Sequence, residues 1–185
     1  KNVVLFGVGK MGEAYTKVLQ DLDCQLSIVG RSEQGVQAFQ QSMGLDAISG
    51  GFEGWRSKAS DVDHAIVAVN GEELAPLTIN LLESGVKNVL LEKPGGLDSQ
   101  EIQKVAHKAK ELQANVVLAY NRRFYASTRK AKEMIEEEGG ITSFYFDFTE
   151  RTKVIEQQNL NPDILKYWIL ANSSHVIDLA FYLGG

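Results

Sequence analysis

The sequence predicts an α/β protein built on a doubly wound parallel sheet. Short apolar runs alternate with longer segments of helical periodicity, and this alternation is typical of βαβ units. The first apolar run, residues 3–6, is followed directly by glycines at positions 7, 9 and 12 that open a helical segment. Ligands of such sheets bind beyond the carboxyl ends of the strands, so we expect functional residues where the apolar runs end.

The composition is that of an ordinary globular protein, with 44% hydrophobic and 23% charged residues in a chain of 185. The formal net charge is −5 and the charges of both signs are interspersed, so neither nucleic acid nor an anionic membrane is expected as a partner. No apolar run approaches the roughly 20 residues of a membrane-spanning helix. The single cysteine, Cys24, is expected in the core, and with three scattered histidines it predicts no metal site. We therefore expect a cytoplasmic protein with a small-molecule substrate.

The first βαβ unit carries a dinucleotide-binding fingerprint over residues 7–12, with Lys10 and Met11 between its last two glycines. Gly7 permits a tight turn, Gly9 lets the backbone approach a pyrophosphate, and Gly12 lets the helix pack closely on the strand. The helix, expected to reach about residue 22, offers unpaired N–H groups and the positive end of its dipole to the phosphates. The pattern predicts a bound dinucleotide.

The second strand, residues 26–29, ends in Gly30, Arg31 and Ser32. An enzyme that prefers NAD usually carries an acidic residue at this strand end, where it binds the ribose 2′-hydroxyl. Arg31 and Ser32 instead offer a cation and a hydroxyl that suit a 2′-phosphate, so NADP is the expected cofactor and NAD the alternative. The other interpretation of these residues is an ordinary surface turn.

The next elements follow from periodicity and turn residues. We expect a helix over 33–42, a short strand over 45–48, a loop over 50–60, a strand over 64–69 and a helix over 72–83. Asn70 ends the strand over 64–69, and we expect it at the crevice near the nicotinamide ribose.

The most informative stretch is residues 89–96, where an apolar run stops at Glu92, Lys93, Pro94 and two glycines. A parallel strand that ends here places Lys93 at the mouth of the crevice, on a backbone restrained by Pro94. A lysine in that position can take a proton from a substrate hydroxyl or return it. The alternative is a solvated lysine at a strand end.

The remaining elements complete the pattern. Asp98 and Glu101 have the form of a helix N-cap with its partner three residues on, and this helix is expected to reach residue 113. We expect strands over 115–119 and 141–151, a helix over 124–138, and a mainly helical apolar segment over 165–183. The strand over 141–151 is expected because phenylalanines alternate with polar residues.

Three motifs in this order resemble those of the Gfo/Idh/MocA oxidoreductase family. They are the glycine pattern at 7–12, Glu92-Lys93-Pro94, and the segment 120–124, which reads Tyr-Asn-Arg-Arg-Phe. The family includes glucose–fructose oxidoreductase, inositol dehydrogenase and, more distantly, biliverdin reductase. The resemblance covers essentially the whole chain. It implies a Rossmann domain over residues 1–121 and, over 122–185, the start of an α+β domain with an open, mostly antiparallel sheet that often serves in oligomer formation.

The resemblance also implies site residues. Lys93 and His175 would be catalytic, and the bond between Lys93 and Pro94 would be cis, although sequence alone favours trans. The second domain would continue beyond Gly185. The residues expected at the cofactor are Gly7, Gly9, Lys10, Met11, Gly12, Arg31, Ser32, Asn70, Glu92, Lys93, Asn121 and Arg122.

One position departs from the family pattern. Catalytic members commonly carry an aspartate four residues before the histidine, and Ala171 stands there in this chain. We therefore expect an NADP-dependent oxidoreductase acting on a sugar, polyol or related carbonyl or hydroxyl compound, and two alternatives stay open. One is a non-catalytic NADP-binding sensor or assembly protein, and the other is a reductase of the biliverdin type.

Overall fold

The computed structural model describes residues 1–58, 61–157 and 167–185. The chain divides into two compact units, Lys1–Ala119 and Tyr120–Gly185, and each is described by itself. The first two residues of the helical segment expected over 165–183 lie outside the described residues.

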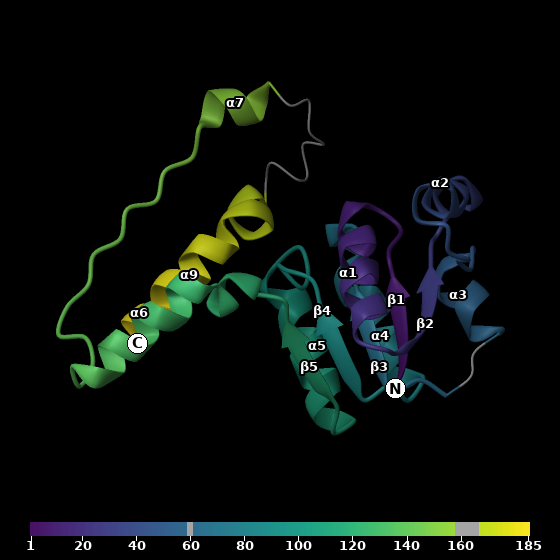
Figure 1. Ribbon diagram of the computed structural model, residues 1–185, viewed down its shortest axis with the longest axis horizontal. Coiled ribbons are helices and arrows are strands. Elements are labelled where there is room, and N and C mark those ends of the chain that lie inside the picture. The colour runs from purple at the N-terminus through teal and green to yellow at the C-terminus, as the bar shows by residue number, and fades with distance from the viewer. Residues whose placement is uncertain (59–60, 158–166) are drawn as a thin grey trace. The chain divides into compact units, whose positions relative to one another are not determined.

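The first unit contains a five-stranded parallel sheet with the order β2-β1-β3-β4-β5 (Figure 1). The chain moves from β1 outward to β2, then returns to the other side of β1 and continues outward to β5. This confirms the predicted doubly wound parallel sheet. The strands are β1 (Asn2–Phe6), β2 (Gln25–Val29), β3 (His64–Val67), β4 (Asn88–Leu91) and β5 (Asn115–Leu118).

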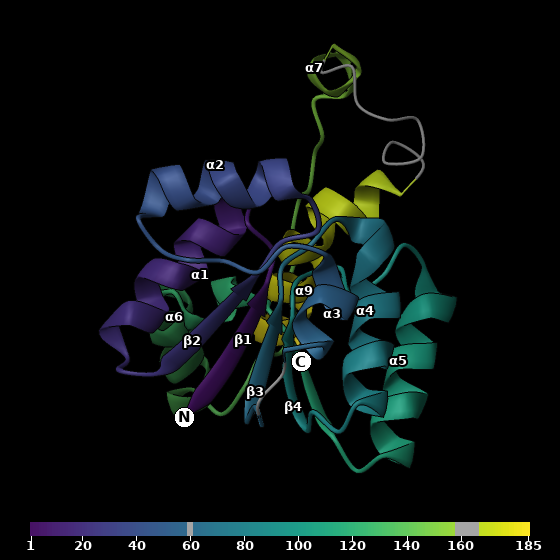
Figure 2. The same cartoon turned by 90° about the vertical axis from the view of Figure 1, so that its right-hand side faces the viewer.

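Five helices connect these strands. They are α1 (Lys10–Asp21), α2 (Glu33–Met43), α3 (Gly51–Arg56), α4 (Gly71–Glu83) and α5 (Ser99–Glu111). Helices α4 and α5 lie side by side on one face of the sheet, and α1 packs on the other face (Figure 2). Right-handed crossovers require this division, because the chain moves in one direction across the sheet from β1 to β2 and in the opposite direction after β2.

Core clusters lie on both faces of the sheet. Val4 and Phe6 of β1 belong to the larger cluster, and Val3 and Leu5 belong to a smaller one with Leu19 of α1. Consecutive residues of a strand point to opposite faces, so burial on both faces requires the continuous apolar runs seen in the sequence. This packing fixes the carboxyl edge of the sheet, where the predicted site residues of the first unit lie.

Two predictions between β2 and β3 were wrong in detail. Residues 45–48 form no strand, because only Ile48 pairs, in an isolated bridge with Val29, so β4 is the fourth strand of the sheet and not the fifth. Residues 51–56 form helix α3 where a loop was expected. Burial of Trp55 against Phe6, with ring centroids 5.5 Å apart, stabilises this short helix.

The second unit is mainly helical among the described residues. It contains the 3-10 turn η1 (Asn121–Phe124), α6 (Ala126–Glu137), α7 (Thr152–Glu156), the π-helical turn η2 (Ile169–Ser173) and α9 (Ser174–Gly184). No described helix of the whole chain has both the length and the apolar character needed to cross a membrane.

The strand predicted over residues 141–151 is not formed. The alternation of aromatic and polar residues is present, but a strand needs a neighbour for its backbone hydrogen bonds, and none lies beside this segment in the described part of the unit. Phe144 and Phe146 stack on each other with centroids 6.3 Å apart. The ring of Phe144 also lies against Gly184, where an added Cβ would come within 2.4 Å of it. Residues 121–157 and 167–185 therefore contain no part of the expected antiparallel sheet.

Candidate functional site

The turn after β1 has the geometry of a phosphate-binding loop. Gly7 has φ +128°, and a Cβ added to it would lie 2.2 Å from the carbonyl oxygen of Ala68. A Cβ added to Gly12 would lie 2.0 Å from the carbonyl oxygen of Gly7. By contrast, a Cβ on Gly9 would meet nothing within 4 Å. Packing thus requires glycine at positions 7 and 12, whereas Gly9 keeps the space outside the turn open.

The open side of this turn, at the amino end of α1, has the geometry of an anion site. Gly9 is the N-cap residue of α1 and has no side-chain cap, and the first helical hydrogen bond runs from Glu13 N to Gly9 O. The N–H groups of the first turn therefore have no partner within the helix, and together with the dipole they favour a phosphate. The hollow at this turn has a volume of about 390 Å³. It is lined by Gly7, Val8, Gly9, Lys10, Met11, Arg31, Ser32, Ala68, Val69, Asn70 and Glu73.

A second hollow, of about 510 Å³, adjoins the first. The two share Gly7, Arg31, Val69 and Glu73. The second is walled by Phe52 of α3 and by Pro76 and Leu77 of α4, which suits a flat aromatic base. The pair of hollows therefore fits the phosphates and the adenosine of a dinucleotide.

The sequence had not indicated the side chains that α3 and α4 contribute to this second hollow. Phe52 lies in a segment that was expected to be a loop, and Glu73 lies in the first turn of α4, where an acidic residue is ordinary. For these side chains, the only signal in the sequence was a helix expected to start at the edge of the crevice. That signal does not indicate which side chain of the helix faces the ligand.

Arg31 and Ser32 stand at the carboxyl end of β2, as predicted. The guanidinium of Arg31 forms an ion pair with the carboxylate of Glu73. The hydroxyl oxygen of Ser32 accepts a hydrogen bond of 3.1 Å from Gly35 N and so caps α2, while its hydrogen can still be donated to a ligand.

Glu92 and Lys93 follow β4 at the same edge of the sheet. The bond between Lys93 and Pro94 is cis, as the resemblance implied. One carboxylate oxygen of Glu92 accepts a hydrogen bond of 2.7 Å from Tyr15 Oη of α1, and the other accepts one of 3.2 Å from the backbone N of Lys93. Burial and the adjacent Glu92 carboxylate raise the pKa of the Tyr15 phenol above its ordinary value. Tyr15 thus ties the phosphate-binding helix to the strand end that carries Lys93.

The second unit holds the other predicted site residues. Asn121 and Arg122 lie in η1, and His175 is the second residue of α9. The ring of His175 packs edge-on against Tyr120, with centroids 5.7 Å apart. These residues therefore come from two elements of one unit, whereas the residues from Gly7 to Lys93 belong to the other unit.

Arg123 holds η1 and α9 together. Its Nε donates a hydrogen bond of 2.8 Å to Asp178 Oδ2, its Nη2 bonds the other carboxylate oxygen, and its guanidinium lies 4.8 Å from the ring centroid of Tyr182. The hydrogen bond to Asp178 raises the pKa of Arg123 above its ordinary value. Only its place in the motif at 120–124 had drawn attention to Arg123, and no signal in the sequence paired it with Asp178.

Ala171 lies in η2, and a carboxylate lies near this turn. Glu150 accepts hydrogen bonds from the hydroxyl of Ser173 and from Asn172 Nδ2, the latter at 3.2 Å. The hydrogen bond from Ser173 lowers the pKa of Glu150. The start of α9 is therefore not devoid of acidic groups, although position 171 itself is apolar.

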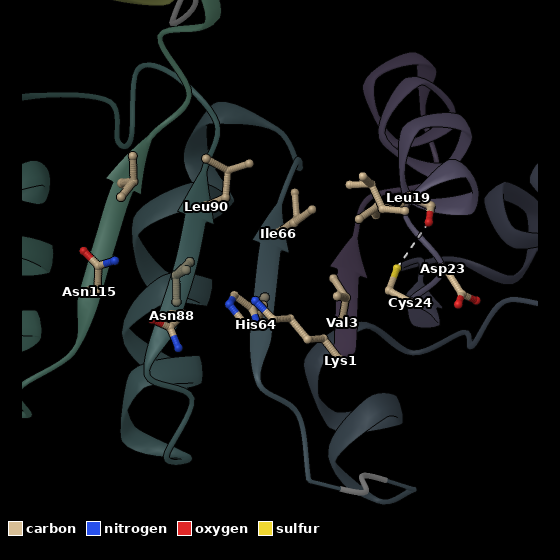
Figure 3. A pocket seen from close by; sticks show the side chains of 14 residues that line it. Lys1, Val3, Leu19, Asp23, Cys24, His64, Ile66, Asn88, Leu90 and Asn115 are labelled. Carbon is tan, nitrogen blue, oxygen red and sulfur yellow. Dashed lines mark hydrogen bonds between the residues drawn. The ribbon is translucent and has the colours of Figure 1, made fainter.

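Another hollow of the first unit, of about 640 Å³, lies away from this site (Figure 3). It is the uncovered part of the sheet face beside α1, where Val3, Ile66 and Leu90 project from neighbouring strands. Cys24 lies at its border and donates a hydrogen bond of 3.3 Å to Leu19 O. The hollow extends to the amino ends of the strands, away from the edge where such sheets bind ligands. No group of side chains in the described residues has the composition of a metal site.

Comparison with known proteins identifies the family. Residues 1–120 match the Gfo/Idh/MocA family, described as an oxidoreductase family with an NAD-binding Rossmann fold. A comparison with curated proteins gave no significant match.

Solved structures share the fold over the full length of this chain. Myo-inositol 2-dehydrogenase from Lactobacillus plantarum is 18% identical, with a TM-score of 0.78 over 100% of this chain and 56% of its own. The WlbA dehydrogenase from Bordetella pertussis, in complex with NADH and UDP-GlcNAcA, is 16% identical, with a TM-score of 0.77 over 100% of this chain and 59% of its own. A probable dehydrogenase from Thermotoga maritima is 19% identical, with a TM-score of 0.75 over 100% of this chain and 55% of its own.

The chain thus spans little more than half the length of these structures. The family match covers the sheet, the phosphate-binding turn and the strand end with Lys93. This chain belongs to the Gfo/Idh/MocA family of oxidoreductases.

Proposed function

We propose that this chain is the cofactor-binding part of an NAD(P)-dependent dehydrogenase that acts on a CH–OH group of a sugar, polyol or related compound. The observation that carries the proposal is the position of Lys93. It follows β4 at the edge of the sheet where the phosphate-binding turn follows β1, and only β3 separates the two strands. Neighbouring strands are about 5 Å apart, so a dinucleotide held by the turn extends readily to the end of β4.

Different residues of the chain then have different roles at this site. The backbone N–H groups at Gly9, Lys10 and Met11 bind the pyrophosphate, and Asn70 lies beside the part of the cofactor that reaches β3. When bound, the nicotinamide supplies the two-electron acceptor or donor for the substrate carbon. Lys93 accepts the proton of the substrate hydroxyl during oxidation and returns it during reduction.

Glu92 and Tyr15 support this role of Lys93. The backbone N of Lys93 donates to Glu92, whose other oxygen is held by Tyr15, so the turn that carries the lysine is fixed on two sides. We propose that Asn121 and Arg122 complete the cofactor site and that His175 orients the substrate or assists the proton transfer.

For the cofactor, we propose that NADP(H) is preferred and NAD(H) accepted. The support for NADP(H) is Arg31 and Ser32 at the end of β2, where they offer a cation and a hydroxyl to a 2′-phosphate. The support for NAD(H) is that the WlbA dehydrogenase from Bordetella pertussis contains NADH in its solved structure.

The substrate class and assembly are proposed on similar grounds. Two of the similar structures are named for myo-inositol or contain UDP-GlcNAcA, and both compounds carry several hydroxyl groups. We further propose that residues 141–151 become a strand when further chain supplies a neighbour, and that the resulting sheet joins copies of the protein. The aromatic side chains already alternate in that segment.

The experiment is a turnover assay of the purified protein with NADH and NADPH against a panel of keto-sugars, inositols and sugar nucleotides, followed in the reverse direction with the matching alcohols. The proposal predicts turnover with at least one polyhydroxy compound. Tight cofactor binding without turnover of any compound would contradict it and would favour a non-catalytic NADP-binding sensor, the alternative that Ala171 suggests.

A further inference from the structure

We infer that Glu73 sets the balance between NAD(H) and NADP(H) in this chain. Its carboxylate takes the place of the acidic residue that is missing at the end of β2, and it competes with a 2′-phosphate for Arg31. The inference rests on the proposed dinucleotide site and assigns a specificity-determining residue within it.

Position 30, directly after β2, has no room for an acidic side chain, and position 31 is an arginine. A Cβ added to Gly30 would lie 2.6 Å from Val36 Cγ2 and 2.9 Å from Val8 Cγ2, both in packed valine side chains. Gly30 N also donates a hydrogen bond of 2.8 Å to Ile48 O, which holds the backbone in place. Any carboxylate that reads the ribose must therefore come from another element.

Glu73 reaches the right place from α4. It lies in the first turn of that helix, and it lines both the phosphate hollow and the adjoining apolar hollow, as Arg31 does. The part of a dinucleotide that joins its phosphates to its adenine is the adenosine ribose. The ribose must therefore pass the side chains that border both hollows, and of these only Arg31 and Glu73 are charged.

The ion pair of Arg31 and Glu73 has consequences for both cofactors. Within the described residues, Glu73 uses Oε1 for Arg31, and Oε2 remains able to accept a hydrogen bond from a ribose hydroxyl. A 2′-phosphate carries a charge of about −1.5 to −2 and is repelled by the same carboxylate. The Arg31 side chain is 68% exposed, so the pair itself is weak and opens readily. Repulsion from Glu73, rather than the strength of the pair, thus limits NADP binding.

Glu72 supplies a matched control. It is adjacent in sequence, carries the same charge and lines the apolar hollow, but it does not line the phosphate hollow. A general effect of removing one negative charge near the site would appear in Glu72→Gln as well as in Glu73→Gln, whereas a specific effect on the ribose would appear only in Glu73→Gln.

The test measures dissociation constants of NADH and NADPH for the purified protein and for Glu73→Gln, Glu72→Gln and Arg31→Ala. Glu73→Gln is expected to raise the ratio of NADPH to NADH affinity by about tenfold or more at low salt, and the gain should shrink as salt screens the charges. Glu72→Gln should change the ratio by less than about threefold, within the range of a screened surface charge. Arg31→Ala should weaken NADPH and leave NADH nearly unchanged.

Two outcomes would overturn the inference. One is an unchanged ratio in Glu73→Gln, and the other is an equal change in Glu73→Gln and Glu72→Gln. The binding of 5′-AMP and 2′,5′-ADP to the same variants repeats the comparison without the nicotinamide. If the unmodified protein bound none of these nucleotides, the proposed function would fail instead, and the two failures are therefore distinguishable.

Discussion

Among single residues, Tyr15 offers the sharpest test of how the site is held. Its hydroxyl donates a hydrogen bond of 2.7 Å to Glu92, and neither residue is fully exposed. Tyr15→Phe leaves that carboxylate oxygen without its donor, so we expect the free energy of unfolding to fall by ~1.5 kcal/mol, at the low end for hydrogen bonds to charged groups. Urea unfolding measures this change. Tyr145→Phe is the control, because Tyr145 is 88% exposed, and it should change stability by less than about 0.5 kcal/mol.

The same hydrogen bond predicts a pH dependence. Burial and Glu92 raise the pKa of Tyr15 in the folded protein, so its stabilising contribution is complete below the unfolded pKa of about 10 and is lost as the pH rises above it. The difference in unfolding free energy between the unmodified protein and Tyr15→Phe should therefore shrink as the pH rises from about 10 to about 12. A difference that stayed constant over this range would show that the phenol is not held by the carboxylate.

At the scale of elements, substitutions at the amino end of α1 allow the effect on packing and the effect on cofactor binding to be measured separately. Gly12→Ala places a Cβ 2.0 Å from Gly7 O, so the helix must shift and we expect a loss of about 2 kcal/mol of stability. Gly9→Ala places its Cβ in open space at an ordinary φ of −89°, so stability should be nearly unchanged. That Cβ nevertheless occupies the path of the pyrophosphate, and NADPH affinity should fall by at least about tenfold. For both variants, calorimetric titration measures NADPH affinity and urea unfolding measures stability. Normal NADPH binding by Gly9→Ala would contradict the assignment of this turn as the pyrophosphate site.

The elements also show which parts of the fold the sequence predicts. Strands and helices of the first unit were predictable because burial on two faces leaves continuous apolar runs and helical stripes. Helix α3 was not, because two glycines at its start and its short length resemble a loop, and the tertiary contact of Trp55 with Phe6 that stabilises it is not visible in the sequence. Glu73 was missed for a related reason, since an acidic residue in the first turn of a helix has an ordinary explanation.

For the molecule as a whole, the sequence does not predict which segments and side chains pair with one another. The alternation over residues 141–151 predicts a strand with two faces, but no residue in that segment specifies a neighbouring strand, and the described residues supply none. The motifs at residues 7–12, 92–94 and 120–124 did predict the family, because they depend on local turns and strand ends. They do not predict contacts such as that of Arg123 with Asp178, which join residues far apart in sequence.

The central claim, that Lys93 moves the substrate proton, is tested most directly by Lys93→Met. The measurement is kcat with the substrate found in the turnover assay, together with the dissociation constant of the preferred cofactor. We expect kcat to fall by about 10²–10⁴-fold, the usual contribution of general acid–base catalysis, while cofactor affinity changes little. Lys104→Met, on the exposed side of α5, is the control and should keep full activity. Unchanged kcat in Lys93→Met, or a loss explained entirely by weaker cofactor binding, would contradict the account.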